Sequence, residues 1–301
     1  MPDSIPTEEE VRALLRDRRN WGRWGADDQV GAVNLITAEK RVQAASLVRS
    51  GRTVSLSRPL PTTPAANNPT PAQHFMRWQD GPIGNATDYY GTSYHGLSTT
   101  HLDALCHMWG EDGMWNGRSP SELTPNGTKW GGVENWSNGI VTRGVLLDVP
   151  KFRGTPFVTL ESPVHGFELE RVAEAQGVEI HPGDALIVNC GREAYEREVG
   201  PWGADPWNRP GLHASCLPFI RDTDAAVLVW DMLDLRPTGY GLNWGVHPVL
   251  FSYGVCLVDN AILESLAQAC EAEGRYEFML TLAPLVVIGG TGSPLNPIAI
   301  F

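Results

Sequence analysis

The chain has 301 residues, of which 42% are hydrophobic and 19% charged, and its formal net charge is −12. This composition is typical of a globular protein that can bury a sizeable core. The acidic balance, with no basic stripe, argues against a nucleic-acid partner and against an anionic membrane surface. No secretory signal and no segment of transmembrane length is present, so we expect a cytoplasmic protein. The five cysteines lack a Cys-x-x-Cys pair and are expected in the core.

The first part of the chain predicts a helical segment over about residues 1–50. The sequence at 7–10 is a capping box that begins an amphipathic helix, and Thr37 can cap a second helix. Residues 53–57 then alternate as a strand does. Residues 61–71 contain four prolines and almost no large apolar side chain, which indicates a long loop. We expect this loop to be a lid or rim of a site, or else a surface excursion or an oligomer contact.

The run from residue 101 to residue 107 is the strongest functional signal in the chain. On an extended segment, His101, Asp103 and His107 would project from one face, and Cys106 from the other. Two imidazoles and a carboxylate form a donor set that suits zinc or manganese and needs no thiolate. The alternative is that both histidines are core residues bonded to backbone carbonyls and that Asp103 is a cap or turn residue.

The segment that follows is rich in glycine, proline and tryptophan. Trp109, Trp115 and Trp130 could form flat apolar walls for an aromatic substrate, although tryptophan also serves simply as packing. Such a substrate would be a small molecule. The sequence therefore leaves open whether these three side chains bind a ligand or fill the interior.

The second half of the chain predicts a mixed α and β structure. A helix through Leu169 and Val172 is closed by Gly177. Strands outnumber helices, which favours sheets flanked by a few helices. The expected strands cover residues 139–149, 185–190, 225–230 and 276–282.

Two isolated polar residues in this half have two interpretations each. Arg192 follows a predicted strand, where it could clamp a carboxylate or simply lie on the surface. His213 lies beside a Gly-Leu turn, where it could line a pocket or be structural. For neither residue does a neighbouring residue in the sequence decide between the two interpretations.

The run at 101–107, extended upstream, resembles the His-x-Gly-Thr-His-x-Asp-x-Pro-x-His signature of the cyclase superfamily of metal-dependent hydrolases. That superfamily includes bacterial kynurenine formamidase and isatin hydrolase. The resemblance implies that His101 and Asp103 are metal ligands and that His107 is the catalytic acid and base. This sequence departs from the signature at three positions, because Leu97, Thr99 and Leu105 replace its first histidine, glycine and proline.

His95 lies two residues upstream of the missing ligand and would replace it if the chain bends there. The resemblance further implies that His247 is a remote ligand and that Asp259 occupies the position of a bridging glutamate. A shorter carboxylate makes a bridge between two ions less secure, so we expect one divalent ion, zinc or manganese. Asp259 also precedes an apolar helix, so Asp259 or Asn260 could instead cap that helix.

The resemblance extends to residues 24–34 and 292–297, which look like the entry and closing segments of longer family members. It implies one cyclase-like domain over residues 1–301 with the swivelling β/β/α fold of the family. It also implies a homo-oligomer, either a dimer or a tetramer.

These observations predict a metal-dependent hydrolase of a small cyclic amide, lactone or aryl formamide. Leu97, Thr99 and Asp259 leave a second interpretation open, a non-hydrolytic cyclase or dehydratase with a weakened or lost metal site. A third interpretation, a non-catalytic binding protein, is opposed by the retention of His101, Asp103 and His107.

Overall fold

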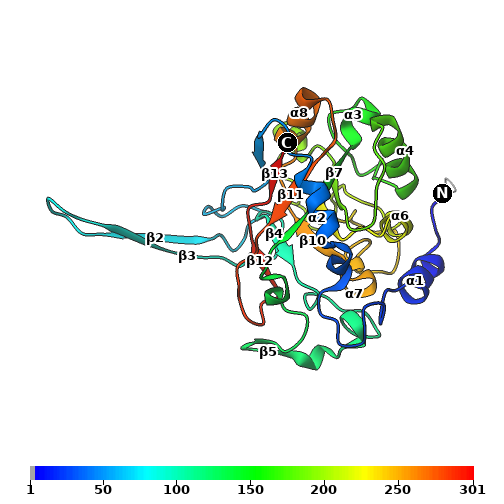
Figure 1. The fold of residues 1–301 in the computed structure, drawn as a ribbon, viewed down its shortest axis with the longest axis horizontal. Helices are drawn as coiled ribbons and strands as arrows, with labels where there is room; N and C mark the ends of the chain where they lie inside the picture. Colours follow the sequence, from blue (N-terminus) through cyan, green and yellow to red (C-terminus); the bar gives the residue numbers. More distant parts are fainter. Residues whose placement is uncertain (1–3) are drawn as a thin grey trace.

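The computed structural model describes residues 4–301, which form a curled nine-stranded mixed sheet flanked by helices and a long two-stranded arm (Figure 1). The sheet order is β1 (Thr53–Ser55), β13 (Ile298–Ile300), β11 (Glu277–Leu282), β7 (Ile140–Asp148), β8 (Ala185–Asn189), β9 (Val227–Trp230), β10 (Cys256–Asp259), β4 (His101–Asp103) and β12 (Gly292–Pro294). The four strands from β7 to β10 run parallel, and the other pairs are antiparallel.

Helices cover this sheet and fill the connections between its strands. The α-helices are α1 (Glu8–Asp17), α2 (Ala38–Ala45), α3 (Val149–Arg153), α4 (Gly166–Gln176), α5 (Arg192–Glu198), α6 (Cys216–Asp222), α7 (Val249–Tyr253) and α8 (Glu264–Glu273). The 3-10 helices are η1 (Gly31–Leu35), η2 (Trp115–Gly117), η3 (Pro120–Glu122) and η4 (Val133–Trp136). The mixed α/β class expected from the sequence, with a sheet flanked by helices, is confirmed. None of the helices within residues 4–301 is long and apolar enough to span a membrane.

The local signals of the sequence produce the elements they predict. Thr7 and Glu10 form a complete capping box at α1, and the Thr37 hydroxyl accepts a hydrogen bond from the Lys40 amide at α2. Of the expected N-terminal helical segment, residues 1–3 lie outside the described residues. Gly177 ends α4 in the left-handed conformation, with a φ of 66°, which glycine adopts without strain.

The central strands form the core of the molecule. Every residue of β8, β9 and β10 is buried, as parallel strands covered on both faces require. All five cysteines are buried and unpaired, which confirms their expected place in the core.

Two small ribbons accompany the large sheet. One is β5 (Leu123–Thr124) with β6 (Gly127–Thr128), and the other is β2 (Gln73–Trp78) with β3 (Ala86–Gly91). The β2–β3 ribbon is the arm of Figure 1, and the sequence did not predict it. The loop predicted over residues 61–71 does form immediately before it, with only an isolated bridge between Ala65 and Asn68.

Strand β4 connects the first half of the chain to its C-terminal end. It pairs antiparallel with β10 on one side and with β12 on the other. His101 lies opposite Asp259 in this register, and Asp103 lies opposite Leu257 and Gly292. Residues that are distant in sequence therefore meet at one end of the sheet.

Candidate metal centre

His101 and Asp103 lie on one face of β4, with Leu102 pointing to the opposite, fully buried side. The His101 Nε2 atom is 3.4 Å from Asp103 Oδ1. Its Nδ1 atom lies 2.8 Å from the Thr99 carbonyl oxygen, to which it donates, so Nε2 is left as the free nitrogen.

The expectation of one extended segment from residue 101 to residue 107 is wrong beyond Asp103. The strand ends there, and a turn closed by the His107 amide bonding to the Ala104 carbonyl oxygen brings His107 back towards Asp103. The three side chains thus meet through a strand followed by a turn, and side-chain alternation accounts only for the first two.

His95 comes to the same place from the segment that follows the arm. Its Nδ1 atom is 2.9 Å from Asp103 Oδ1, and its Nε2 atom is 2.9 Å from the Thr291 hydroxyl. Leu97, at the position of the missing family histidine, is held elsewhere, because its carbonyl oxygen accepts a hydrogen bond from Arg192. The chain between His95 and β4 is therefore bent, which was the condition for His95 to replace the missing histidine.

His247 and Asp259 complete the group from the C-terminal half. His247 Nε2 is 3.3 Å from Asp259 Oδ2, and His101 Nε2 is 3.8 Å from the same oxygen. The indole of Trp230 donates to Asp259 Oδ1 at 2.5 Å. The aspartate therefore projects from the end of β10 into the space between two imidazoles.

The capping interpretation of Asp259 and Asn260 is wrong. Helix α8 begins at Glu264, and its N-cap residue makes no side-chain capping bond. The Asn260 amide instead donates to the carbonyl oxygens of Gly96 and Thr99, which fixes the segment leading into β4.

Five of these side chains form what we call the His/Asp cluster: His95, His101, Asp103, His247 and Asp259. They fall into two overlapping groups of possible metal ligands. One contains His95, His101 and Asp103, and the other contains Asp103, His247 and Asp259. Within each group the possible ligand atoms lie within 4.8 Å of one another. Asp103 belongs to both groups and is therefore the centre of the cluster.

The donor set fits a divalent cation. Both Asp103 carboxylate oxygens and His95 Nδ1 are buried, and within residues 4–301 they form no hydrogen bond of regular geometry, although His95 Nδ1 lies only 2.9 Å from Asp103 Oδ1. Burial alone would raise the pKa of Asp103, but the neighbouring His107 and His101 lower it well below its usual value, which keeps the carboxylate charged. A buried carboxylate costs several kcal/mol unless positive charge compensates it, and a cation between Asp103 and the imidazole nitrogens would do so. Three imidazoles and two carboxylates suit zinc or manganese.

Asp234 is a functional candidate that sequence reasoning missed. Its Oδ1 atom accepts the backbone N–H groups of Gly245, Val246 and His247, and its Oδ2 atom contacts His247 Nδ1. Although burial opposes ionisation, the His247 charge and these donors lower the pKa of Asp234. A carboxylate on Nδ1 turns Nε2 of the same ring towards the cluster, as the outer partners of metal-binding histidines do. In the sequence, Asp234 is marked only by being an acidic residue shortly after a buried strand.

His107 stands between the His/Asp cluster and a cavity of about 890 Å³. Its Nε2 atom is 3.9 Å from Asp103 Oδ2, and its ring stacks on that of His95 with centroids 3.8 Å apart. Burial is the largest of the effects that lower the pKa of His107 to about 4, which leaves the imidazole neutral. His107 and His247 both line the cavity.

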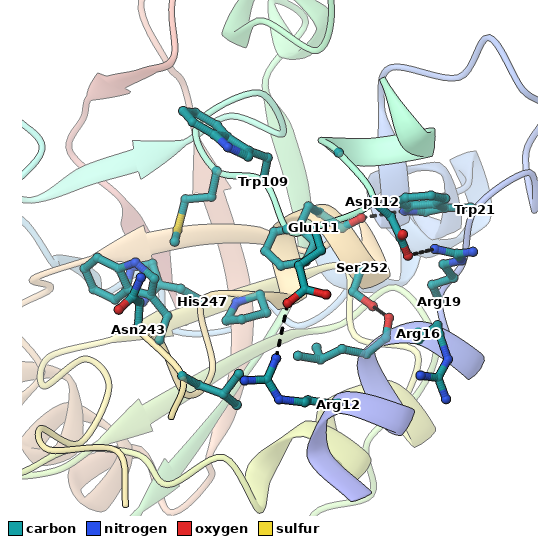
Figure 2. Close-up of a pocket in the computed structure, with 18 of the residues that line it drawn as sticks. Arg12, Arg16, Arg19, Trp21, Trp109, Glu111, Asp112, Asn243, His247 and Ser252 are labelled. Carbon is teal, nitrogen blue, oxygen red and sulfur yellow. Dashed lines mark hydrogen bonds and ion pairs between the residues drawn. The ribbon is translucent and has the colours of Figure 1, made fainter. Parts of the chain in front are cut away.

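Charged and aromatic side chains both line the cavity, and Trp21 lies beside Asp112 and Arg19 (Figure 2). Arg12 in α1 pairs with Glu111, and Arg19, just after that helix, pairs with Asp112 (Figure 2). The aromatic lining comes from Trp21, Trp109, Trp244 and Phe251.

Of the three tryptophans considered as substrate walls, only Trp109 lines the cavity, and half of its surface is exposed. Trp115 and Trp130 are buried in the interior, so packing is the correct interpretation for both. The loop at 61–71 contributes no residue to the lining, so it is not a rim of this cavity.

Arg192 and His213 have structural contacts. Arg192 is buried rather than on the surface, and it donates to the Leu97 carbonyl oxygen and to the Asn260 side chain, so it is not a free carboxylate clamp. His213 Nδ1 accepts the Ser215 amide, and burial is the main effect that lowers the pKa of this histidine to about 4. Neither residue belongs to the His/Asp cluster or to the cavity lining.

Comparison with known proteins gives consistent results. A family model described as "Putative cyclase" matches residues 53–236. No curated protein matches the sequence. The crystal structure of a protein described as a novel cyclase is 30% identical, with a TM-score of 0.85, and the match covers 95% of this chain and 99% of that one.

Isatin hydrolase A from Labrenzia aggregata, bound to benzyl benzoate, has a similar fold. It is 18% identical with a TM-score of 0.55, over 85% of this chain and 94% of that chain. A predicted metal-dependent hydrolase from Bacillus stearothermophilus is 15% identical with a TM-score of 0.50, over 83% of this chain and 98% of that chain. The match to the family model and the similarity along almost the whole chain show that this protein belongs to the cyclase family.

Proposed function

We propose that the protein is a metal-dependent hydrolase of a small cyclic amide, lactone or aryl formamide. The observation that carries the proposal is the buried Asp103 carboxylate, which forms no regular hydrogen bond within the described chain and is surrounded by three imidazoles and a second carboxylate. His95, His101, Asp103, His247 and Asp259 would hold one zinc or manganese ion. Such an ion supplies Lewis acidity that activates water and polarises a carbonyl group.

His107 would act as the acid and base. It lines the cavity, lies 3.9 Å from Asp103 and, unlike His247, belongs to neither group of possible ligands. A neutral imidazole in this position can accept a proton from the attacking water and return it to the leaving nitrogen or oxygen. Stacking on His95 holds its ring in this orientation.

The cavity lining supports an aromatic substrate. The rings of Trp109, Trp244 and Phe251 provide apolar surface beside His107 and His247. The isatin hydrolases of similar fold bind aromatic compounds, as their descriptions state. An aryl formamide or a ring fused to a lactam would place its apolar part on these walls.

The interpretation as a non-hydrolytic cyclase or dehydratase depended on a dismantled metal site. Leu97 cannot bind a metal, but His95 lies within 2.9 Å of Asp103 and supplies the third imidazole. Asp259 is shorter than a glutamate, yet its carboxylate reaches both His247 and His101. This geometry favours the hydrolase.

The test is the metal content of protein purified without a metal-affinity tag, measured by elemental mass spectrometry. We expect about one equivalent of zinc or manganese in the wild type and loss of that metal in Asp103→Ala. His107→Ala should keep the metal and lose about 10²- to 10⁴-fold in turnover of formamides, lactones or cyclic amides. His213→Ala is the matched control and should keep both metal and activity.

Two results would contradict the proposal. One is a wild-type protein that takes up neither zinc nor manganese after exposure to them. The other is a His107→Ala variant that loses metal and turnover together, which would place His107 among the ligands.

A further inference from the structure

Arg209, between α5 and α6, and Arg236, between β9 and α7, lie side by side, and we call them the arginine pair. They form an isolated antiparallel bridge, in which the backbone N–H group of each residue donates to the carbonyl oxygen of the other, at 2.9 and 3.0 Å. Directly opposite residues of an antiparallel pair carry their side chains on the same face. The two guanidinium groups therefore leave the bridge on one side, although like charges in such positions repel each other.

The guanidinium group of Arg209 is buried and only partly used. The residue is 4% exposed, and its Nη1 atom donates to the Pro206 carbonyl oxygen at 2.6 Å. Its Nε and Nη2 atoms, and the Nε atom of the partly buried Arg236, are enclosed without a hydrogen-bond partner within residues 4–301. Nε and Nη2 form one edge of the guanidinium group, a planar fork that matches both oxygens of a carboxylate.

Arg153 shows how the protein satisfies the same fork elsewhere. Its Nε and Nη2 atoms each donate to one carboxylate oxygen of Glu168, both at 2.6 Å, and both side chains are mostly buried. Neither Arg209 nor Arg236 forms such an ion pair with any carboxylate of residues 4–301. The arginine pair thus has the donors for a carboxylate but no carboxylate of its own.

The acids that act on Arg209 are bound to other groups. Burial, the largest effect, and the Arg236 charge lower the pKa of Arg209, against the opposing charges of Asp234 and Asp259. Asp234 accepts three backbone N–H groups and contacts His247 Nδ1, and Asp259 belongs to the His/Asp cluster. A buried cation in this position is stabilised only if an anion comes from elsewhere.

Indole rings cover the faces of both guanidinium groups. Arg209 Cζ lies 5.5 Å from the centre of the Trp202 ring, and Arg236 Cζ lies 4.4 Å from that of Trp244 and 5.8 Å from that of Trp207. Rings that stack on the faces of a guanidinium group leave its edges for an anion. Trp207 is 70% exposed, and every residue of 204–208 is exposed, so this segment is the side from which a ligand can enter.

We propose that the arginine pair is a binding site for a small aromatic carboxylate. The edge of Arg209 would bind both carboxylate oxygens, Arg236 Nε would donate to one of them, and the indoles would contact the ring of the ligand. Neither arginine lines the cavity of about 890 Å³, so the ligand is a separate molecule rather than the hydrolysed substrate. Trp244 does line that cavity and lies 4.8 Å, between ring centroids, from His247, so a bound acid adjoins a wall of the candidate active site. The site itself does not depend on the proposed function.

The first experiment is isothermal titration calorimetry with sodium benzoate. The protein is treated with a chelator and then dialysed, so that neither a metal ion nor the carboxylates of the chelator take part, and sodium chloride keeps the ionic strength constant. We expect saturable binding of one benzoate per chain. Acetate should bind at least tenfold more weakly, because it has no ring for the indoles to contact.

Two substitutions locate the bound benzoate. Arg236→Gln removes a charge from the partly buried member of the pair, and Arg209→Lys keeps the charge but removes the fork. Each should weaken benzoate binding at least tenfold and leave the far-UV circular dichroism spectrum unchanged. Arg197→Gln is the matched control, because Arg197 is an exposed arginine paired with Glu264, and it should bind benzoate as the wild type does.

Two results of the calorimetry would overturn the proposal. One is a wild type that shows no saturable binding of benzoate. The other is benzoate affinity that is equal in wild type, Arg236→Gln and Arg209→Lys, because the acid then binds at another place. A loss of affinity in Arg236→Gln alone would overturn the role of the Arg209 fork.

Nuclear magnetic resonance of the arginine side chains needs no unfolding-prone variant. In wild-type protein labelled with ¹⁵N-arginine, benzoate should shift the Nε–H signals of Arg209 and Arg236, and the two variants identify these signals by their absence. Shifts confined to other arginines would contradict the assignment of the site.

Kinetics of the zinc-loaded enzyme decide whether the carboxylate is a separate molecule, and this part rests on the proposed function. Hydrolysis of formanilide is compared with that of formamidobenzoate, which carries a carboxylate, in wild type and in Arg236→Gln. A separate acid predicts that the ratio of the two KM values is the same in both proteins. A KM that rises at least tenfold for formamidobenzoate alone would overturn this and assign the pair to a carboxylate of the substrate. An enzyme that hydrolyses neither compound would be a failure of the proposed function, and the calorimetry would still decide the site.

Discussion

At the scale of single residues, Asp103 determines what the cluster can do. Its carboxylate is common to both groups of possible ligands and is fully buried, and its polar neighbours within the described residues are imidazole nitrogens. The surrounding imidazoles each have an outer partner that fixes one nitrogen, such as the Thr99 carbonyl for His101 and Asp234 for His247. The cluster is therefore preorganised, and the orientation of its rings does not depend on a bound ligand.

Asp234→Asn should weaken metal binding without removing a ligand. The amide can still accept backbone hydrogen bonds, but it cannot provide the negative charge that orients and polarises the His247 ring. Loss of such an outer partner typically costs 10- to 100-fold in metal affinity. The measurement is a competitive zinc titration against a chromophoric chelator.

Asp184→Asn is the control for this substitution. Asp184 is equally buried, but it pairs with Lys40 and Arg143 rather than with the cluster. It should lower the free energy of unfolding and leave zinc affinity unchanged. If both variants bind zinc as the wild type does, Asp234 has only a structural role.

Prediction from sequence was most successful where the signal was local. His101 and Asp103 share a strand, so alternation alone places them together, and His95 followed once a bend was allowed. Asp234 could not be found in this way, because its contact with His247 depends on a loop between two strands. Arg192 was also misjudged, since a buried arginine is expected only when its partners are known, and these are the Leu97 carbonyl and Asn260.

At the scale of elements, the three-residue strand β4 depends on close approach by β12. A Cβ atom at Gly292 would lie 2.2 Å from the Leu102 carbonyl oxygen and 3.2 Å from His95 Cε1. Only glycine allows the two strands to pair at this point. The backbone contact at Gly292 thus sets the positions of His101, Asp103 and His95 together.

Gly292→Ala should therefore separate β12 from β4 and disturb the cluster. We expect a lower melting temperature and at least a tenfold loss of zinc affinity, measured by calorimetry and by chelator competition. Gly96→Ala is the control, because a Cβ atom there meets no atom within 4 Å and the residue lies just beside His95. A Gly292→Ala variant that behaves like Gly96→Ala would show that the strands can adjust without cost.

Among the secondary-structure elements, some could be predicted from the sequence and others could not. Thr7, Thr37 and Gly177 act on neighbouring backbone groups, so helix ends could be predicted from them. The β2–β3 arm could not, because alternation reveals a strand only when one face is buried. Both faces of the arm carry apolar residues and both are exposed, so the pattern carries no periodic signal.

At the scale of the whole molecule, a metal held by the cluster would join segments from both halves of the chain. Chelation should lower the melting temperature of the wild type, because a ligand that binds only the folded state contributes about 2.7 kcal/mol when present at 100 times its Kd. Differential scanning calorimetry with and without chelator measures the shift. In Asp103→Ala the chelator should have no effect. An equal shift in wild type and variant would point to a metal elsewhere.

The position of β4 has a consequence for the newly made protein. This strand comes from the first half of the sequence, but its pairing partners β10 and β12 are among the last strands to be synthesised. A chain still on the ribosome can form α1, α2 and the hairpin of β2 and β3 while His101 and Asp103 have nothing to pair with. Contacts of such large sequence separation form late and slowly. The cluster is therefore assembled only after β12 has been synthesised, so a metal held by it would bind after that stage.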